Sequence, residues 1–234
     1  MFNFKYETRY GDFRDFDTIK MGSVLDIIQD VSTKNSAHLG YGILKLKEMN
    51  KAWLLKGMNV HFEKKVSTLC PVDVYTAVKE PKGATSQRGC ILKQNGKIVA
   101  KSIADWFLFD TEKMRPVRIP EEIKKIYEIY DFEDDFFEYR KPEIIIDAKI
   151  KYSIRVSNKD IDTNKHLNNQ RGADLMMDAL PYDFEFNNIS ILYKKSTYLG
   201  DELDVCVEKL ENGYYVHMQD KDKNICVVGR FENL

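Results

Sequence analysis

The alternation of apolar and polar positions at the start of the chain predicts a β-strand from about Phe2 to Tyr10. Phe2, Phe4 and Thr8 fall at even positions along this stretch, together with a tyrosine at position 6. A spacing of two places side chains on one face of an extended chain. The chain is therefore expected to open with a strand that buries one face.

A helix is expected next, from a cap at Ser23 to about Leu39. Serine is a common residue at a helix N-cap, and the glycine at position 40 is typical of the residue that ends a helix. The apolar residues recur with the period of an amphipathic helix. The positions that share this face are Val24, Ile27, Ile28 and Val31.

Four segments rich in β-branched and aromatic residues follow, and turn residues divide them. The turns are Pro81-Lys82-Gly83 and Gln94-Asn95-Gly96, of which the second has hairpin chemistry. One helix followed by a series of long strands predicts an antiparallel sheet with a helix on one face. The predicted strands are Trp53–Phe62, Asp73–Lys79, Thr85–Leu92 and Lys97–Phe109.

The segment Pro120–Asp147 mixes many acidic residues with many aromatic ones, so it is expected to be an ordered connection packed along the surface. The strand and helix pattern then restarts at Ala148. Asn168 or Asn169 is the expected cap of the second helix, and Pro181 its expected end. The strands predicted in this half are Lys149–Val156, Asn188–Lys194, Glu202–Leu210, Gly213–Gln219 and Ile225–Glu232.

The two halves also share a sequence repeat. The segment Asp160–Asn169 aligns with Asp15–Ser23, where Asn164 falls opposite Ile19 and His166 opposite Met21. Residues 191–205 and 60–74 match in the same order. A tandem duplication with one intact and one degraded motif is predicted. We expect an N-terminal domain at 1–125, a connection at 126–147, a C-terminal domain at 148–234, and the same strand order in both domains.

Composition narrows the functional classes. The length of 234 residues suits two domains of ordinary size. The chain has 36 basic and 37 acidic side chains, which give a net charge of -1. No overall positive charge therefore favours the binding of nucleic acid. The four cysteines are scattered, as expected for free thiols in a reducing compartment. No apolar run approaches the roughly 18 residues needed to span a bilayer. A cytoplasmic protein without a membrane span is predicted.

Asp162, Asn164 and His166 are the candidate chemical residues. If their segment is extended, the three side chains share one side and line one cleft. The helix start behind them offers backbone N–H groups that suit an oxyanion. A carboxylate, an imidazole that activates water and a positioning amide form a plausible hydrolytic set. The alternative is an ordinary capped turn, because Asp, Thr and Asn are common turn and cap residues. Neither a metal nor a cofactor is expected.

At these residues the sequence resembles the acyl-ACP thioesterases, the plant and bacterial family that terminates fatty acid chains. The resemblance implies an α+β protein with two tandem hotdog domains, an acyl chain lodged mainly in the N-terminal domain, and catalysis in the C-terminal one. It also implies that Asp162, Asn164 and His166 are the catalytic residues. The matching segments are Gln29-Asp30, His38-Leu39-Gly40, Ala52–Leu55, Asp105–Asp110, Arg115-Pro116-Val117 and Asp160–Asn169.

The chain departs from the family after the strand that ends in Tyr193-Lys194-Lys195. Members usually place a glutamate at the next positions, whereas this chain has Ser196 and Thr197. Ser196 is therefore the candidate replacement of the family glutamate. Asp201 and Glu202 follow a turn and are not assigned that role.

The expected activity is hydrolysis of fatty acyl-ACP thioesters to free fatty acid and carrier protein, which ends chain elongation. The expected partner is an acyl carrier protein with a fatty acyl chain, and the expected assembly is a monomeric pseudo-dimer or a homodimer. The alternatives are a non-catalytic acyl-binding hotdog protein, an acyl-CoA thioesterase, and a hotdog dehydratase. Release of free acid separates hydrolysis from binding, and an enoyl product would indicate the dehydratase.

Overall fold

A computed structural model describes all residues of the chain except 15–18, 65, 68–69 and 132–135. Contacts between residues divide the chain into two compact units. The first unit comprises Met1–Lys56 and Val60–Tyr139, and the second comprises Gly57–Asn59 and Arg140–Leu234.

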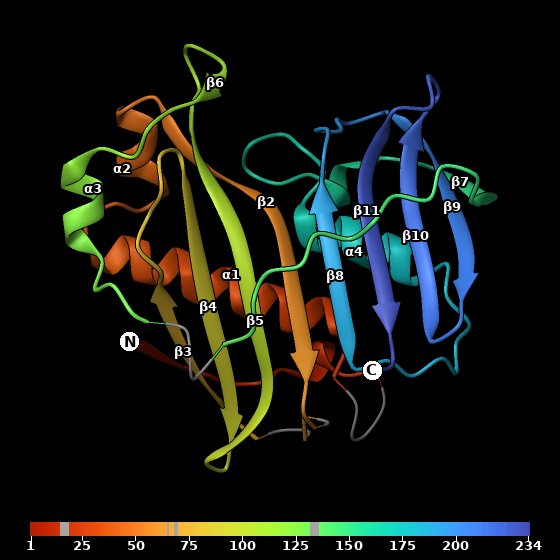
Figure 1. Cartoon of the computed structure of the whole chain (residues 1–234), viewed down its shortest axis with the longest axis horizontal. Coiled ribbons are helices and arrows are strands. Elements are labelled where there is room, and N and C mark those ends of the chain that lie inside the picture. Colours follow the sequence, from red (N-terminus) through yellow and green to blue (C-terminus); the bar gives the residue numbers. More distant parts are fainter. Residues whose placement is uncertain (15–18, 65, 68–69, 132–135) are drawn as a thin grey trace. The chain divides into compact units, whose positions relative to one another are not determined.

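The first unit is an antiparallel sheet with its longest helix packed on one face (Figure 1). Its strand order is β1-β3-β4-β5-β2, and β6 pairs with β5. The strands are β1 (Phe2–Tyr6), β2 (Lys51–Phe62), β3 (Val72–Val78), β4 (Thr85–Gln94), β5 (Lys97–Asp110) and β6 (Arg115–Pro116). The helices are α1 (Met21–His38), α2 (Ile43–Glu48) and α3 (Glu121–Ile126).

The second unit repeats this plan with the order β7-β9-β10-β11-β8, and α4 (Asn169–Met177) contacts β10 and β11 (Figure 1). Its strands are β7 (Lys149–Arg155), β8 (Asn188–Tyr193), β9 (Glu202–Leu210), β10 (Gly213–Asp220) and β11 (Ile225–Glu232). In both units the strand order begins with the first strand of the unit and ends with the strand that follows its helix. The prediction of one strand order for both halves is therefore confirmed.

Helix α1 buries the predicted apolar face, since Val24, Ile27, Ile28 and Val31 are all nearly inaccessible. Its predicted start is wrong. The helix begins at Met21, and its cap residue gives no side-chain hydrogen bond. The backbone N–H of Lys20 bonds to the carbonyl of Asp12 in the preceding turn and fixes the start instead. The predicted end is confirmed, because Gly40 adopts a φ of 83°, a conformation that suits glycine.

The strand ends agree with the sequence predictions to within two residues, with one exception. The opening strand was expected to continue to Tyr10 but stops at Tyr6, because the chain enters a 3-10 turn at Tyr10–Asp12. The predicted hairpin between β4 and β5 is confirmed. Asn95 and Gly96 both have positive φ angles, 51° and 75°, as a tight two-residue hairpin turn requires.

Helix α4 begins after Asn168, which resolves the choice between the two predicted caps. The helix ends at Met177 and not at Pro181, because Ala179 and Leu180 already donate to carbonyls three residues back and tighten the chain into turns. Met176 in the helix and Ala179 in the turn after it are both buried.

Several described residues of the connecting segment pack on apolar clusters. Tyr127 is buried against α3 residues in an apolar cluster of the first unit. The ring of Phe136 lies so close to Gly89 that a Cβ at this position would meet it at 2.5 Å. In the second unit, Ile144 and Ile145 pack on a cluster that contains Tyr215. Among the described helices, none has the length and apolar composition needed to cross a membrane.

In both units the same pair of residues brackets the repeated motif: an aspartate that ends a 3-10 turn and the residue just before the helix begins. We call this bonded pair the frame. The pairing of residues that it gives differs from the sequence alignment. The N–H of Lys20 bonds to the carbonyl of Asp12 at 2.8 Å, and the N–H of Asn168 bonds to the carbonyl of Asp160 at the same distance. Each aspartate is buried and ends a 3-10 turn. Asp12 is thus the counterpart of Asp160, and the predicted match of Asp15 is wrong by three residues.

The same register applies to the neighbouring positions. Ile19 forms a β-bridge with Phe13, just as Leu167 does with Ile161. Ile19 is therefore the counterpart of Leu167 and a core residue, and its alignment with Asn164 was wrong. Asp15, Asp17 and Thr18 of the degraded motif lie outside the described residues, as do Lys65, Thr68 and Leu69 of the second repeated segment. Aspartates at 12, 15 and 17 make the register ambiguous in sequence, and the backbone bond from Lys20 to the carbonyl of the buried Asp12 selects the first.

The buried Asp160 carboxylate joins the 3-10 turn to α4. It accepts hydrogen bonds from the backbone N–H and hydroxyl of Ser157 and pairs with the guanidinium of Arg171 at 3.1 Å. Burial acts to raise the pKa of this carboxyl, but the bonds from Ser157 and Arg171 outweigh it and hold the pKa below its ordinary value. The pKa of Asp12 is likewise lowered, because bonds from Arg9 outweigh its burial.

Asp160→Asn is expected to lower the free energy of unfolding at pH 7 by about 1.5–3 kcal/mol, the range for hydrogen bonds to charged groups. A lowered folded-state pKa means that the contribution is complete above the unfolded pKa of about 3.9 and is lost as the pH falls through the folded value. Urea unfolding should therefore show a gap from wild type that narrows below about pH 4. Asp183→Asn, at an exposed aspartate, is the control. A gap that stays constant down to low pH would contradict this linkage.

Candidate active site

The motif that contains the candidate residues forms a tight loop in the second unit. The N–H of Asp162 donates to the carbonyl of His166 at 2.9 Å, and the N–H of Lys165 donates to the carbonyl of Asp162 at 3.0 Å. Lys165 has a φ of 63°. A turn followed by one left-handed residue is a common three-residue hairpin connection. The predicted extended segment is therefore wrong, and the alternation argument for a shared side fails.

The carboxylate of Asp162 organises this loop. Its Oδ1 accepts the backbone N–H of Asn164 at 2.8 Å and that of His166 at 3.2 Å. Its Oδ2 lies 3.5 Å from the side-chain amide of Asn164, at the limit of a hydrogen bond. The structure thus brings Asp162 and Asn164 together through side chains, and it holds His166 through the backbone. Asn164 is exposed, whereas Asp162 and His166 are half-buried.

A second segment lies beside the loop. The carbonyl of Thr197 accepts the N–H of Leu167 at 2.8 Å, and His166 and Tyr198 form an antiparallel bridge. The imidazole of His166 packs against the ring of Tyr198, with the ring centroids 4.9 Å apart at an interplanar angle of 58°. Sequence reasoning missed Tyr198. Its position two residues after Ser196, in the segment expected to carry a family carboxylate, was the available signal.

Ser196 is exposed and stands two positions before Tyr198 in this segment. Asp201 and Glu202, which follow Tyr198 in the chain, were not assigned a role in the site. Of these, Asp201 accepts the N–H of Tyr198 at 2.9 Å and so fixes the turn after it. That observation agrees with leaving Asp201 outside the chemistry.

The start of α4 is less open to an anion than expected. The side chain of Asn168 accepts the N–H groups of Gln170 and Arg171 at 2.8 and 3.3 Å. Two of the helix N–H groups that were suggested for an oxyanion are thus occupied by the cap. The hydroxyl of Tyr193 donates to the carbonyl of Asn169 at 3.0 Å and ties the first turn of α4 to β8.

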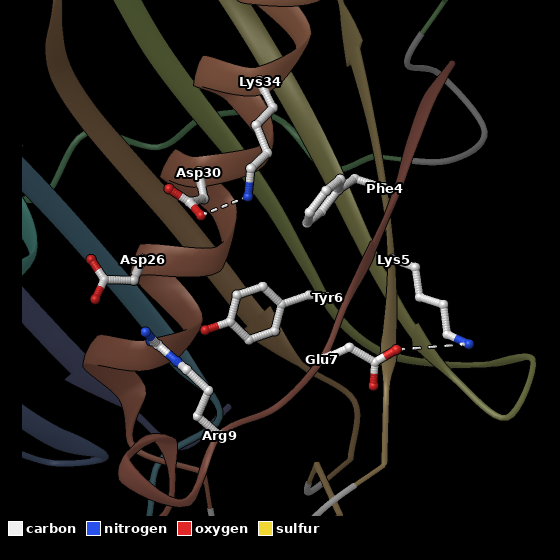
Figure 2. Close-up of a pocket in the computed structure, with 8 residues that line it drawn as sticks. All are labelled: Phe4, Lys5, Tyr6, Glu7, Arg9, Asp26, Asp30 and Lys34. Atoms are coloured by element: carbon white, nitrogen blue, oxygen red, sulfur yellow. Dashed lines mark hydrogen bonds and ion pairs between the residues drawn. The ribbon is translucent and has the colours of Figure 1, made fainter.

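A surface groove in the first unit lies between β1 and α1 and is separate from these residues (Figure 2). Lys34 pairs with Asp30 at 3.0 Å and places its amino group 4.0 Å from the centroid of the Phe4 ring. Most of the lining is charged, so the groove does not suit an aliphatic chain. The lining residues are Phe4, Lys5, Tyr6, Glu7, Arg9, Asp26, Asp30 and Lys34.

Comparison with known proteins gives a family match over both halves. Residues 1–127 match the acyl-ACP thioesterase N-terminal domain, and residues 145–229 match the acyl-ACP thioesterase C-terminal domain. A search of curated protein sequences gives no match.

Two solved structures share the fold over nearly the whole chain. An acyl-ACP thioesterase from Bacteroides thetaiotaomicron superimposes with a TM-score of 0.88 at 16% identity, covering 98% of this chain and 96% of its own. The 12:0-ACP thioesterase from Umbellularia californica gives a TM-score of 0.82 at 15% identity, covering 99% and 96%. The α+β tandem hotdog fold is thus confirmed, with helices packed on antiparallel sheet in each half.

Asp162→Ala and Asp162→Asn separate the structural use of this side chain from its charge. Asparagine retains an oxygen that can accept both backbone N–H groups, whereas alanine leaves them without this partner. We expect alanine to lower the free energy of unfolding by about 1 kcal/mol and asparagine to lower it by clearly less. Urea unfolding of the three proteins measures this. Equal stability of the two variants would show that the carboxylate oxygen does not hold the loop.

Proposed function

Because the chain belongs to the acyl-ACP thioesterase family, which hydrolyses fatty acyl-ACP thioesters, we propose that Asp162, Asn164 and His166 perform that hydrolysis here. One observation carries the assignment. A single carboxylate oxygen of Asp162 binds the backbone N–H groups of both Asn164 and His166. The amide and the imidazole are therefore presented by one fixed loop, as positioned catalysis requires.

His166 is the general base of the proposed mechanism. Its imidazole takes a proton from water while the water oxygen bonds to the thioester carbonyl carbon. The resulting tetrahedral intermediate expels the thiolate, and the imidazolium returns the proton to the sulfur. The products are a free carboxylic acid and the carrier thiol, so one water molecule is consumed and the residue is regenerated.

Asn164 is proposed to bind the carbonyl oxygen or the attacking water through its side-chain amide. Its side chain is exposed and lies beside the Asp162 carboxylate, which accepts from that amide at 3.5 Å. An amide held at one end by a carboxylate has a second N–H to direct at a developing negative charge. Asp162 is proposed to act through both partners, by holding the loop that presents them.

The preferred substrate is proposed to be an acyl chain on a carrier protein, with acyl-CoA as the second donor to be compared. A panel of acyl-ACP and acyl-CoA thioesters with matched chains, assayed for released fatty acid, tests this directly. Binding of the acyl carrier without release of acid would instead favour a non-catalytic acyl-binding protein. The specific reason to test that alternative is Ser196, which stands where the family usually has a glutamate.

His166→Ala is expected to lower kcat by about 10²- to 10⁴-fold, the contribution typical of positioned proton transfer. Release of fatty acid from the best acyl-ACP of the panel measures this loss. His38→Ala, which removes an exposed histidine of α1, is the matched control and should keep the wild-type rate. If His166→Ala also turns over at the wild-type rate, the imidazole is not the base.

Ser196→Glu is expected to raise kcat if the hydrolytic network still accepts the family carboxylate. The position is exposed and lies two residues from the partner of His166 in the adjacent segment, so a longer side chain can be accommodated. Ser196→Gln controls for size, because it has nearly the same shape without the charge. A gain with glutamate alone, with the order of acyl preferences unchanged, supports the network. Equal rates for both variants would exclude a role for a carboxylate at this position.

A further inference from the structure

The ring of Tyr198 is held beside the proposed base by its backbone on both sides. Asp201 accepts the N–H of Tyr198 at 2.9 Å, and the carbonyl of Tyr198 accepts the N–H of Asp201 at 3.1 Å. Gly200 completes this turn with a φ of 89°, a value that favours glycine. On the other side, the carbonyl of Thr197 binds the N–H of Leu167. Tyr198 therefore has a fixed position relative to His166.

The imidazole of His166 needs such a neighbour, because Asp162 does not orient it. Asp162 accepts the backbone N–H groups of Asn164 and His166, and these two bonds leave the imidazole free to rotate about its side-chain torsions. Among the described residues, the aromatic ring that contacts this imidazole is that of Tyr198. A general base has to keep one ring nitrogen within reach of the water that it deprotonates.

We infer that Tyr198 is a positioning residue, whose ring sets the orientation of the His166 imidazole in a chain that has Ser196 in place of the family glutamate. This inference rests on the proposed function, since it takes His166 to be the base. The two rings are tilted by 58° with their centroids 4.9 Å apart, a separation within the range of favourable aromatic pairs. The hydroxyl of Tyr198 is not required for it.

Tyr198→Phe and Tyr198→Ala separate the ring from the hydroxyl. Phenylalanine keeps the ring and should keep kcat close to wild type. Alanine removes the ring and should lower kcat by about two- to ten-fold, the factor that corresponds to an ordinary aromatic pair, with little change in KM. Leu199→Ala is the matched control, because Leu199 is the adjacent residue and is similarly exposed, 56% against 52% for Tyr198. It should leave kcat unchanged.

The contact itself is measured independently of activity by NMR of the His166 imidazole protons. The tyrosine ring current should shift these resonances, phenylalanine should preserve the shift, and alanine should abolish it. Wild-type kcat in Tyr198→Ala, or an equal loss in Tyr198→Phe, would overturn the positioning role while His166→Ala still reports on the base. A wild-type rate in His166→Ala would overturn the proposed function, and the positioning role with it.

Discussion

The carboxylate of Asp160 binds Ser157 in the 3-10 turn on one side and Arg171 in α4 on the other, while its backbone carbonyl accepts the N–H of Asn168. These bonds fix both ends of the segment that carries the candidate residues. A buried carboxylate is tolerated only with such partners, because an unpaired charge in the interior is costly. The position of the loop therefore depends on one satisfied buried charge.

The first unit uses the same frame around Asp12, with Arg9 in the turn and Lys20 at the helix start. Asp12 and Asp160 thus belong to the architecture of each half. The candidate chemical residues lie between the frame positions of the second half only. A shared backbone arrangement can thus carry different residues in each half, because function depends on the side chains placed on a fold and not on the fold itself.

The segment that faces the loop completes the site. It supplies the carbonyl of Thr197 to the backbone of Leu167 and the ring of Tyr198 to His166. Ser196 belongs to the same segment, so the departure from the family and the aromatic neighbour of the proposed base lie two residues apart. In the proposed site, two residues therefore have different roles. The carboxylate of Asp162 shapes the loop, and the ring of Tyr198 constrains the imidazole of His166.

The sequence by itself determined the elements whose signals are local. The period of Val24 to Val31 predicted the buried face of α1, and Asn95-Gly96 predicted a hairpin, because both depend on residues close together in the chain. The motif at 160–169 and its resemblance to a family also identified the candidate residues and the fold.

Only the tertiary structure decided the register of the repeat, the shape of the loop and the neighbour of the imidazole. Choosing Asp12 required knowing that it is buried and that its backbone carbonyl accepts the N–H of Lys20 at the helix start. The carboxylate of Asp162 accepts backbone N–H groups of the loop and so stabilises a turn over an extended chain. The alternation of side chains along the sequence does not reveal this bonding. The contact between His166 and Tyr198 joins two segments that are distant in sequence, and chain topology alone brings them together.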